Sequence, residues 1–179
     1  MKFRDLFSDE IVRRYFIMNT FDGVLTVIGI IIALMLGGVL EAHIVIMSCV
    51  GSGVAMGVSG FWGAYLTERA ERKFDVMSKG VKRTARLIDR NIKISIIVSL
   101  VDGLSPFLAM FLLIIPFLFM PVMDAYIVSF IIGGLVISLL GVFIARIGKD
   151  NILLSILKML AAGIAVTFII YLLELFKVV

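Results

Sequence analysis

The chain has 179 residues, of which 61% are hydrophobic and 17% are charged. Soluble globular proteins contain about 45–50% apolar residues, so this excess cannot fill one water-soluble core. The net charge of +4 is carried at the ends of apolar segments, a distribution that argues against a nucleic-acid partner. The single cysteine, Cys49, excludes an intrachain disulfide and a Cys-based metal cluster.

Five apolar segments are long enough to cross a bilayer, which takes about 20 residues of helix. They lie at residues 17–40, 44–66, 94–120, 125–147 and 152–176. Their apolar residues do not alternate with period two, as those of a membrane strand would. The first segment contains Asp22 and exceeds the apolar core of a cleavable signal peptide. We therefore predict an all-α integral membrane protein with five transmembrane helices, forming a single membrane domain over residues 1–179.

The positions of the 17 Lys and Arg residues predict the orientation. Four precede the first segment, nine lie between the second and third, three surround the start of the fifth, and Lys177 is left for the other side. The positive-inside rule places the N-terminus in the cytoplasm and the C-terminus on the extracytoplasmic side. Residues 67–93 then form a short basic cytoplasmic connection, into which the second helix continues. We expect residues 81–90 to form a separate basic helix at the headgroup level, and residues 11–16 to do the same.

Segments one and three share a short motif. Phe21-Asp-Gly-Val-Leu and Val101-Asp-Gly-Leu-Ser lie 80 residues apart, and glycine-rich patches follow at Gly51 and Gly133. The pattern predicts a parallel two-helix repeat plus one extra helix, an arrangement found in many transporters. The alternative is chance similarity between apolar helices.

Asp22 and Asp102 are the most informative residues. Each lies ~12–13 Å along its helix from the last preceding Lys or Arg, at 1.5 Å per residue. A carboxylate at the bilayer centre costs at least ~2.5–3.5 kcal/mol, so it faces a helix bundle or water and is a functional candidate. The alternative is a structural carboxylate bonded to a neighbouring helix. Pro106 removes the N–H that would bond the Asp102 carbonyl, which leaves this oxygen either as a cation ligand or as part of a plain kink.

The second segment adds a candidate soft ligand. Its small residues, such as Gly53 and Gly57, predict close helix packing. Met56 lies among them, about 18 Å from Glu68 along the helix and therefore near the membrane midplane. A thioether beside carboxylates suits a borderline transition metal better than Na⁺, K⁺ or Mg²⁺. Apolar filler is the alternative interpretation of Met56.

Glu68, Glu71 and Asp75 share one face of the helix that follows this segment. They are placed to collect cations at the cytoplasmic mouth, or else to pair with Arg72 and its basic neighbours, as surface charges usually do. The sequence contains no P-loop, G-x-S-x-G, H-E-x-x-H or Cys-His zinc spacing. We therefore expect neither an enzyme nor a resident cofactor.

Four motifs together resemble the vacuolar iron transporter family of five-helix metal/proton antiporters. Asn19-Thr-Phe-Asp-Gly-Val-Leu-Thr is similar to its first-helix Asn-Asp-Gly signature, and Gly53-Val-Ala-Met-Gly to its second-helix Gly-Ala-Ile-Ser-Met-Gly. Asp102-Gly-Leu-Ser-Pro-Phe parallels a small-x-x-Pro stretch in the third helix, and Lys158-Met-Leu-Ala-Ala-Gly resembles the Gly-Gly-Leu-Ala-Ala-Gly of the last. The order and spacing of the motifs cover most of the chain.

The resemblance implies a homodimer that exports Fe²⁺ or Mn²⁺ from the cytoplasm in exchange for protons. The cation pathway would lie between protomers, with Asp22 and Met56 as its ligands. Two features depart from the family. Gly60 stands where a glutamate four residues after the methionine is usual, and residues 67–93 lack the long glutamate-rich insertion. Asp102 is an additional buried carboxylate.

The complete candidate metal set is Asp22, Met56, Asp102, Glu68 and Glu71. In a dimer, the two aspartates of each chain would place four carboxylates in one layer. We hypothesise that they hold protons when the site is empty and exchange them for a divalent ion. There are two alternative hypotheses for the function. The protein is a non-transporting membrane scaffold or assembly protein, or it is a transporter of a non-metal cation.

Overall fold

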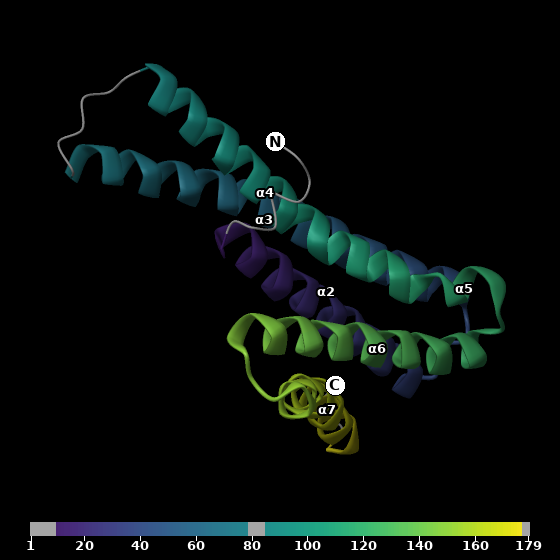
Figure 1. Cartoon of the computed structure of the whole chain (residues 1–179). Helices are drawn as coiled ribbons and strands as arrows, with labels where there is room; N and C mark the ends of the chain where they lie inside the picture. The colour runs from purple at the N-terminus through teal and green to yellow at the C-terminus, as the bar shows by residue number, and fades with distance from the viewer. Residues whose placement is uncertain (1–9, 79–84, 177–179) are drawn as a thin grey trace.

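The computed structural model describes the backbone of residues 10–78 and 85–176, with side chains except those of residues 75–76 and 85–94 (Figure 1). All regular secondary structure in these ranges is helical, and five of the helices are long and apolar enough to cross a membrane. This confirms the predicted all-α membrane fold. The helices are α2 (Glu10–Leu36), α3 (Ala42–Ser78), α4 (Ala85–Ile114), the short α5 (Pro116–Phe119), α6 (Val122–Gly148) and α7 (Ile152–Leu175).

Two predicted interfacial helices are instead parts of longer ones. Residues 11–16 belong to α2, and residues 85–90 belong to α4, so the separate basic helices predicted there were wrong. No proline or glycine interrupts the chain between these residues and the spans that follow, and a helix extends more easily than a new one nucleates. Residues 81–84 lie outside the described residues. The predicted continuation of the second span is confirmed, because α3 runs on to Ser78.

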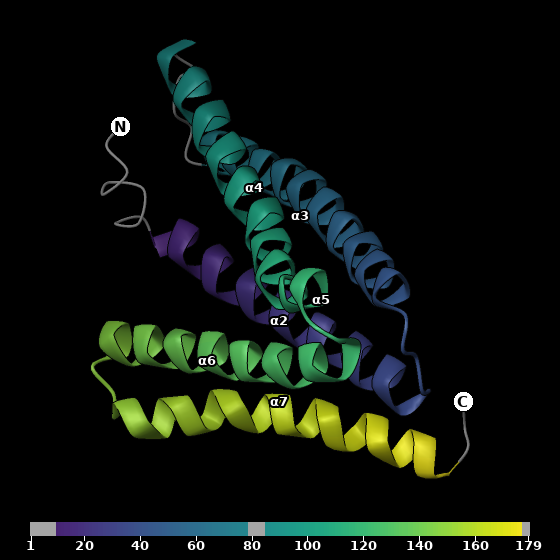
Figure 2. The same cartoon turned by 90° about the vertical axis from the view of Figure 1, so that its right-hand side faces the viewer.

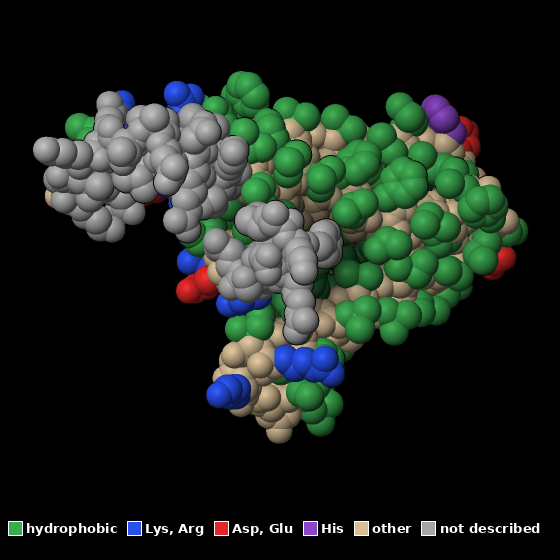
Figure 3. Space-filling model, turned by 45° about the horizontal axis from the view of Figure 1, so that its top comes forward, with side chains coloured by type: hydrophobic (Ala, Val, Ile, Leu, Met, Phe, Trp, Pro, Cys, Tyr) green, Lys and Arg blue, Asp and Glu red, His purple; other side chains and the backbone are tan. Residues whose placement is uncertain are grey.

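The helices form two groups that meet at α2. The long helices α3 and α4 pack side by side, α2 packs against α4, and the antiparallel pair α6 and α7 covers the other side of α2 (Figure 2). We call the end at which α2 begins and α3 ends the basic end. Figure 3 shows Lys and Arg gathered at one end of the face in view, His at the other, acidic side chains at both ends, and apolar side chains between. The buried core surrounds the second half of α2, where Val24, Val27 and Ile31 are almost fully buried.

Glycines bring α2 and α3 close to α4. A Cβ on Gly23 of α2 would lie 2.6 Å from the Cα of Pro106, and a Cβ on Gly53 of α3 would lie 2.6 Å from the end of Met110. At Gly57 the same atom would lie 3.1 Å from the carbonyl oxygen of Gly103. The close packing predicted for the second span is thus observed against α4.

We expect Gly23→Ala to destabilise the protein, because its methyl would overlap the backbone of Pro106 and push α2 from α4. Overpacking of this kind costs about 1–3 kcal/mol. Gly134→Ala on α6 is the control: nothing lies within 4 Å of its added Cβ, and alanine favours a helix by ~1 kcal/mol. Thermal unfolding in detergent should show a melting temperature lowered by several degrees for Gly23→Ala alone. Equal melting temperatures for the two variants would contradict the close α2–α4 contact.

Candidate cation site

The contacts of two glycines align the middles of three helices. Gly23 of α2 abuts Pro106 of α4, and Gly57 of α3 abuts Gly103 of α4. The three helices therefore approach one another within about one turn of these residues. Each predicted site residue of this region directly precedes one of the glycines at these contacts. Asp22, Met56 and Asp102 therefore lie in a single layer.

Asp102 is buried, with 6% of its surface exposed, and it bonds to another helix. The Nδ2 of Asn19 on α2 donates a hydrogen bond to Oδ1 of Asp102 and a second one, of 2.8 Å, to the backbone oxygen of Tyr15. The Asn19–Asp102 bond ties α2 to α4 inside the membrane-spanning region. Sequence reasoning missed Asn19 as a site residue, although it lies one helical turn before Gly23 and so shares the face that meets α4.

The other side of Asp102 lies against α3. An ideal Cβ on Gly60 would be 3.1 Å from Oδ2 of Asp102 and 3.3 Å from its main-chain oxygen. The glycine therefore leaves room for the aspartate of the neighbouring helix. Gly60 is also the position at which the family resemblance leads us to expect a glutamate, so a carboxylate does lie there, but it comes from α4.

Asp22 differs from Asp102 in exposure. Its side chain lies on the surface of the protomer, and Asp22 follows Asn19, the hydrogen-bond partner of Asp102, by about one helical turn, which places the two aspartates near one another. Met18 and Tyr15 precede Asp22 by one and two turns on the same face of α2. This face leads from Asp22 toward the basic end.

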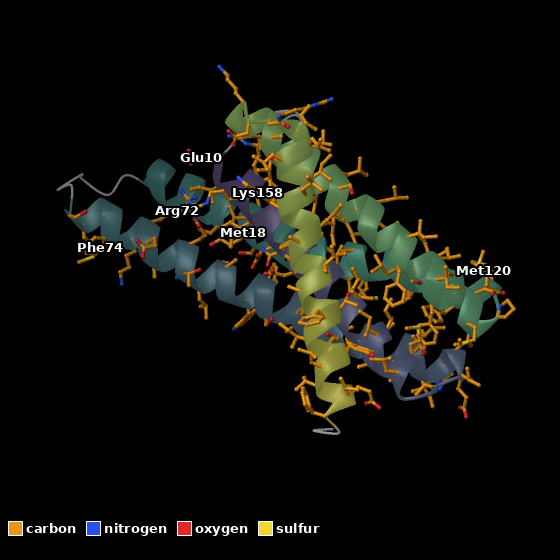
Figure 4. All side chains as sticks on the ribbon, turned by 90° about the horizontal axis from the view of Figure 1, so that it is seen from below. Glu10, Met18, Arg72, Phe74, Met120 and Lys158 are labelled. Atoms are coloured by element: carbon orange, nitrogen blue, oxygen red, sulfur yellow. The ribbon has the colours of Figure 1, made fainter. Side chains whose placement is uncertain are left out.

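A pocket of about 420 Å³ lies between α2 and α3 at the basic end. Figure 4 shows Met18 and Arg72 close together in this region. Arg72 bonds Glu68 across 3.0 Å, so the ion-pair alternative holds for Glu68, whereas Glu71 is exposed at the pocket. The lining residues are Ile11, Arg14, Tyr15, Met18, Glu68, Glu71 and Arg72. The sequence analysis did not recognise Met18 as a possible soft ligand. The feature that could have indicated it is its position four residues before Asp22, on the same face of α2.

The structure thus divides the predicted metal set. Asp22, Met56 and Asp102 share the middle layer, and Glu68 and Glu71 lie at the basic end. Within the part of the chain that is described, no three His, Cys, Asp or Glu side chains gather at metal-binding distance. One protomer therefore offers two carboxylates in the layer, and a metal ion there would need further ligands from the main chain, a thioether or a second protomer.

The comparisons with known proteins add an archaeal relative. The chain is 28% identical over 169 residues to a protein of Methanocaldococcus jannaschii that is described as uncharacterized, covering 90% of this chain and 87% of the relative. No protein-family model matches the chain. No solved structure matches it either.

Proposed function

We propose that the protein transports a divalent transition-metal cation, Fe²⁺ or Mn²⁺, across the membrane in exchange for protons. The observation that carries the proposal is the pair Asp22 and Asp102, two carboxylates that the Asn19–Asp102 hydrogen bond brings within about one helical turn of each other in the middle of the membrane-spanning helices. Among the described residues other than Arg13, no Lys or Arg side chain forms an ion pair with either of them. Met56 lies in the same layer and supplies a soft ligand.

Charge balance favours a divalent ion and proton exchange. Two uncompensated negative charges are costly at membrane depth, and functional intramembrane carboxylates commonly line ion pathways or proton relays. The pair carries two negative charges when it is ionised, and either two protons or one divalent cation neutralises them. Exchange of one state for the other moves no net charge within the layer, which is what an antiporter of this kind requires.

The basic residues support an orientation for the pathway. The positive-inside rule assigns the basic end to the cytoplasm. The pocket at that end, with Tyr15, Met18 and Glu71, is then the entrance from which a cation reaches Asp22. Export from the cytoplasm, as the family resemblance implies, uses this route.

A homodimer through α2 and α3 completes the site. Asp22 is exposed on the protomer surface, where lipid would otherwise meet a carboxylate, and a second copy would cover it. Gly51 and Gly63 of α3 have nothing within 4 Å of an added Cβ, so a neighbouring helix has room to approach them closely. In such a dimer the two chains would bring four carboxylates into one layer.

We expect Gly63→Leu to convert the dimer to a monomer without unfolding it, because the position is open in the protomer. Gly134→Leu on α6 is the matched control, since it is also open in the protomer but lies outside the proposed interface. Native mass spectrometry in mild detergent and cross-linking in lipid give the oligomeric state. A dimer that survives Gly63→Leu and dissociates on Gly134→Leu would place the interface on α6 instead.

Uptake of Mn²⁺ into proteoliposomes tests the proposed function directly. With a pH-sensitive dye inside the vesicles, an inward Mn²⁺ gradient should drive protons outward, and an imposed pH gradient should drive Mn²⁺ accumulation. A non-transporting scaffold predicts neither movement. A transporter of a non-metal cation predicts that a cation such as ammonium, and not Mn²⁺, moves protons.

A further inference from the structure

We propose that the part of α3 beyond the membrane pairs in parallel with the same helix of a second copy of the chain. The contact uses one face of α3, with Phe74 and Met77 as its anchors at the basic end. The inference rests on the homodimer of the proposed function and extends its interface out of the membrane.

α3 is too long to end at the membrane surface. Its 37 residues span about 55 Å at 1.5 Å per residue, whereas a bilayer with its headgroups measures about 40–45 Å. The excess lies at the basic end, where Phe74 and Met77 follow Leu66, the end of the apolar segment, by ~12 Å and ~16 Å along the helix. Lipid hydrocarbon therefore does not cover these two side chains.

Phe74 and Met77 are nonetheless exposed in the protomer, with exposed fractions of 66% and 67%. Figure 4 shows Phe74 projecting from α3 on the side away from Arg72, which lines the pocket between α2 and α3. Exposed apolar side chains that are rimmed by charged ones are typical of a protein–protein contact. The charged rim here includes Lys73, which directly precedes Phe74.

The two side chains continue the face of α3 that we propose to meet a second copy inside the membrane. Members of this face are three or four residues apart, the spacing at which residues share one side of a helix and form the seam of a coiled coil. All of its members from Ser59 onward are exposed in the protomer. The face, which we call the α3 seam, consists of Met56, Ser59, Gly63, Leu66, Ala70, Phe74 and Met77.

The charges beside the α3 seam favour a parallel pair. Lys73 and Glu71 are both exposed, and residues two apart on a helix point in nearly opposite directions, so they lie on opposite flanks of the seam. Two copies inserted in the same direction are related by a two-fold axis along the membrane normal. This axis brings the flank with Lys73 of each copy against the flank with Glu71 of the other, as opposite charges do beside a coiled-coil seam.

The α3 seam also reaches the proposed cation pathway. It begins at Met56, in the layer of Asp22 and Asp102, so pairing of the two seams brings the two Met56 thioethers toward each other between the protomers. The contact at Phe74 and Met77 thus holds together the interface that contains the proposed site.

Cysteine cross-linking of the full chain in lipid tests the α3 seam. A disulfide needs two Cα atoms within about 7 Å, and a two-fold axis brings a residue that close to its own copy only along the seam. Phe74→Cys and Met77→Cys should give cross-linked dimers under a mild oxidant. Arg69→Cys is the control, because Arg69 is exposed on the same helix but lies off the seam, and it should give almost none. The single natural cysteine, Cys49, is fully buried, so the wild-type protein serves as the blank.

Loss of the anchors should weaken dimerisation without unfolding the protein. Phe74→Ser and Met77→Ser should each raise the dissociation constant of the dimer by about 10-fold, the effect of removing one large apolar side chain from a contact. Phe176→Ser is the matched control, because Phe176 is 72% exposed but follows α7 and lies outside the seam. Energy transfer between labelled copies in vesicles, recorded as the protein-to-lipid ratio is lowered, measures the constant.

Two results would overturn the inference. Equal cross-linking of Phe74→Cys, Met77→Cys and Arg69→Cys would indicate random collision. Absence of cross-linking at Phe74 and Met77, in a protein that native mass spectrometry shows to be a dimer, would assign their exposed surface to lipid headgroups or to another protein. Neither result bears on Mn²⁺ transport, which uptake into proteoliposomes measures separately, and failure of that uptake would reject the proposed function while cross-linking still decides the seam.

Discussion

Asp22→Asn should reduce Mn²⁺ transport in proteoliposomes to the level of protein-free vesicles. Asparagine keeps the size of the side chain but lacks the charge, so the layer loses half of the negative charge that a divalent cation neutralises. The fold should survive, because the side chain of Asp22 is exposed on the protomer.

Asp124→Asn is the matched control for this variant. Asp124 is also exposed, but it lies in the first turn of α6, at the end of the bundle opposite the basic end and away from the middle layer. It should transport Mn²⁺ at the wild-type rate. Wild-type uptake by Asp22→Asn, with normal thermal stability, would remove Asp22 from the mechanism.

Asp102→Asn should uncouple cation movement from proton movement. The amide oxygen of asparagine can accept the hydrogen bond of Asn19, so the α2–α4 link is kept, while the exchangeable proton is lost. Since interacting sites titrate as a set, the pH dependence of transport should change along with the number of protons exchanged per cation. These changes should exceed any change in thermal stability.

Parallel recordings of Mn²⁺ uptake and internal pH measure this coupling. In wild-type vesicles, an imposed pH gradient should concentrate Mn²⁺ inside, and in Asp102→Asn vesicles Mn²⁺ should only equilibrate. An unchanged pH profile and proton stoichiometry would make Asp102 structural. The simpler site of Asp22 and Met56 would then replace the proposal.

The sequence predicted the five spans, which the structure confirms, but not the rotation of the helices. Depth follows from counting residues from the last cationic side chain, and this count placed Asp22 and Asp102 in one layer. Rotation depends on an apolar stripe with a polar opposite face, and these helices are apolar nearly all round. The exposure of Asp22 and the burial of Asp102 therefore became apparent only from the packing.

The same reason explains why Asn19 and Gly60 were not recognised as partners of Asp102. The three residues lie on three different helices, and their contacts depend on the close approach of these helices at Gly23 and Gly57. A short polar residue one turn before a glycine is a weak signal in a single sequence. The pairing of Glu68 with Arg72 was easier to predict from the sequence, because residues four apart on one helix are neighbours whatever the helix packs against.

The most direct test is anomalous scattering from crystals of the protein soaked in Mn²⁺. The account predicts a peak in the middle of the membrane-spanning helices, within coordination distance of Asp22 or Asp102. A peak confined to Glu68 and Glu71 at the basic end, or no peak beside either aspartate at saturating Mn²⁺, would contradict it.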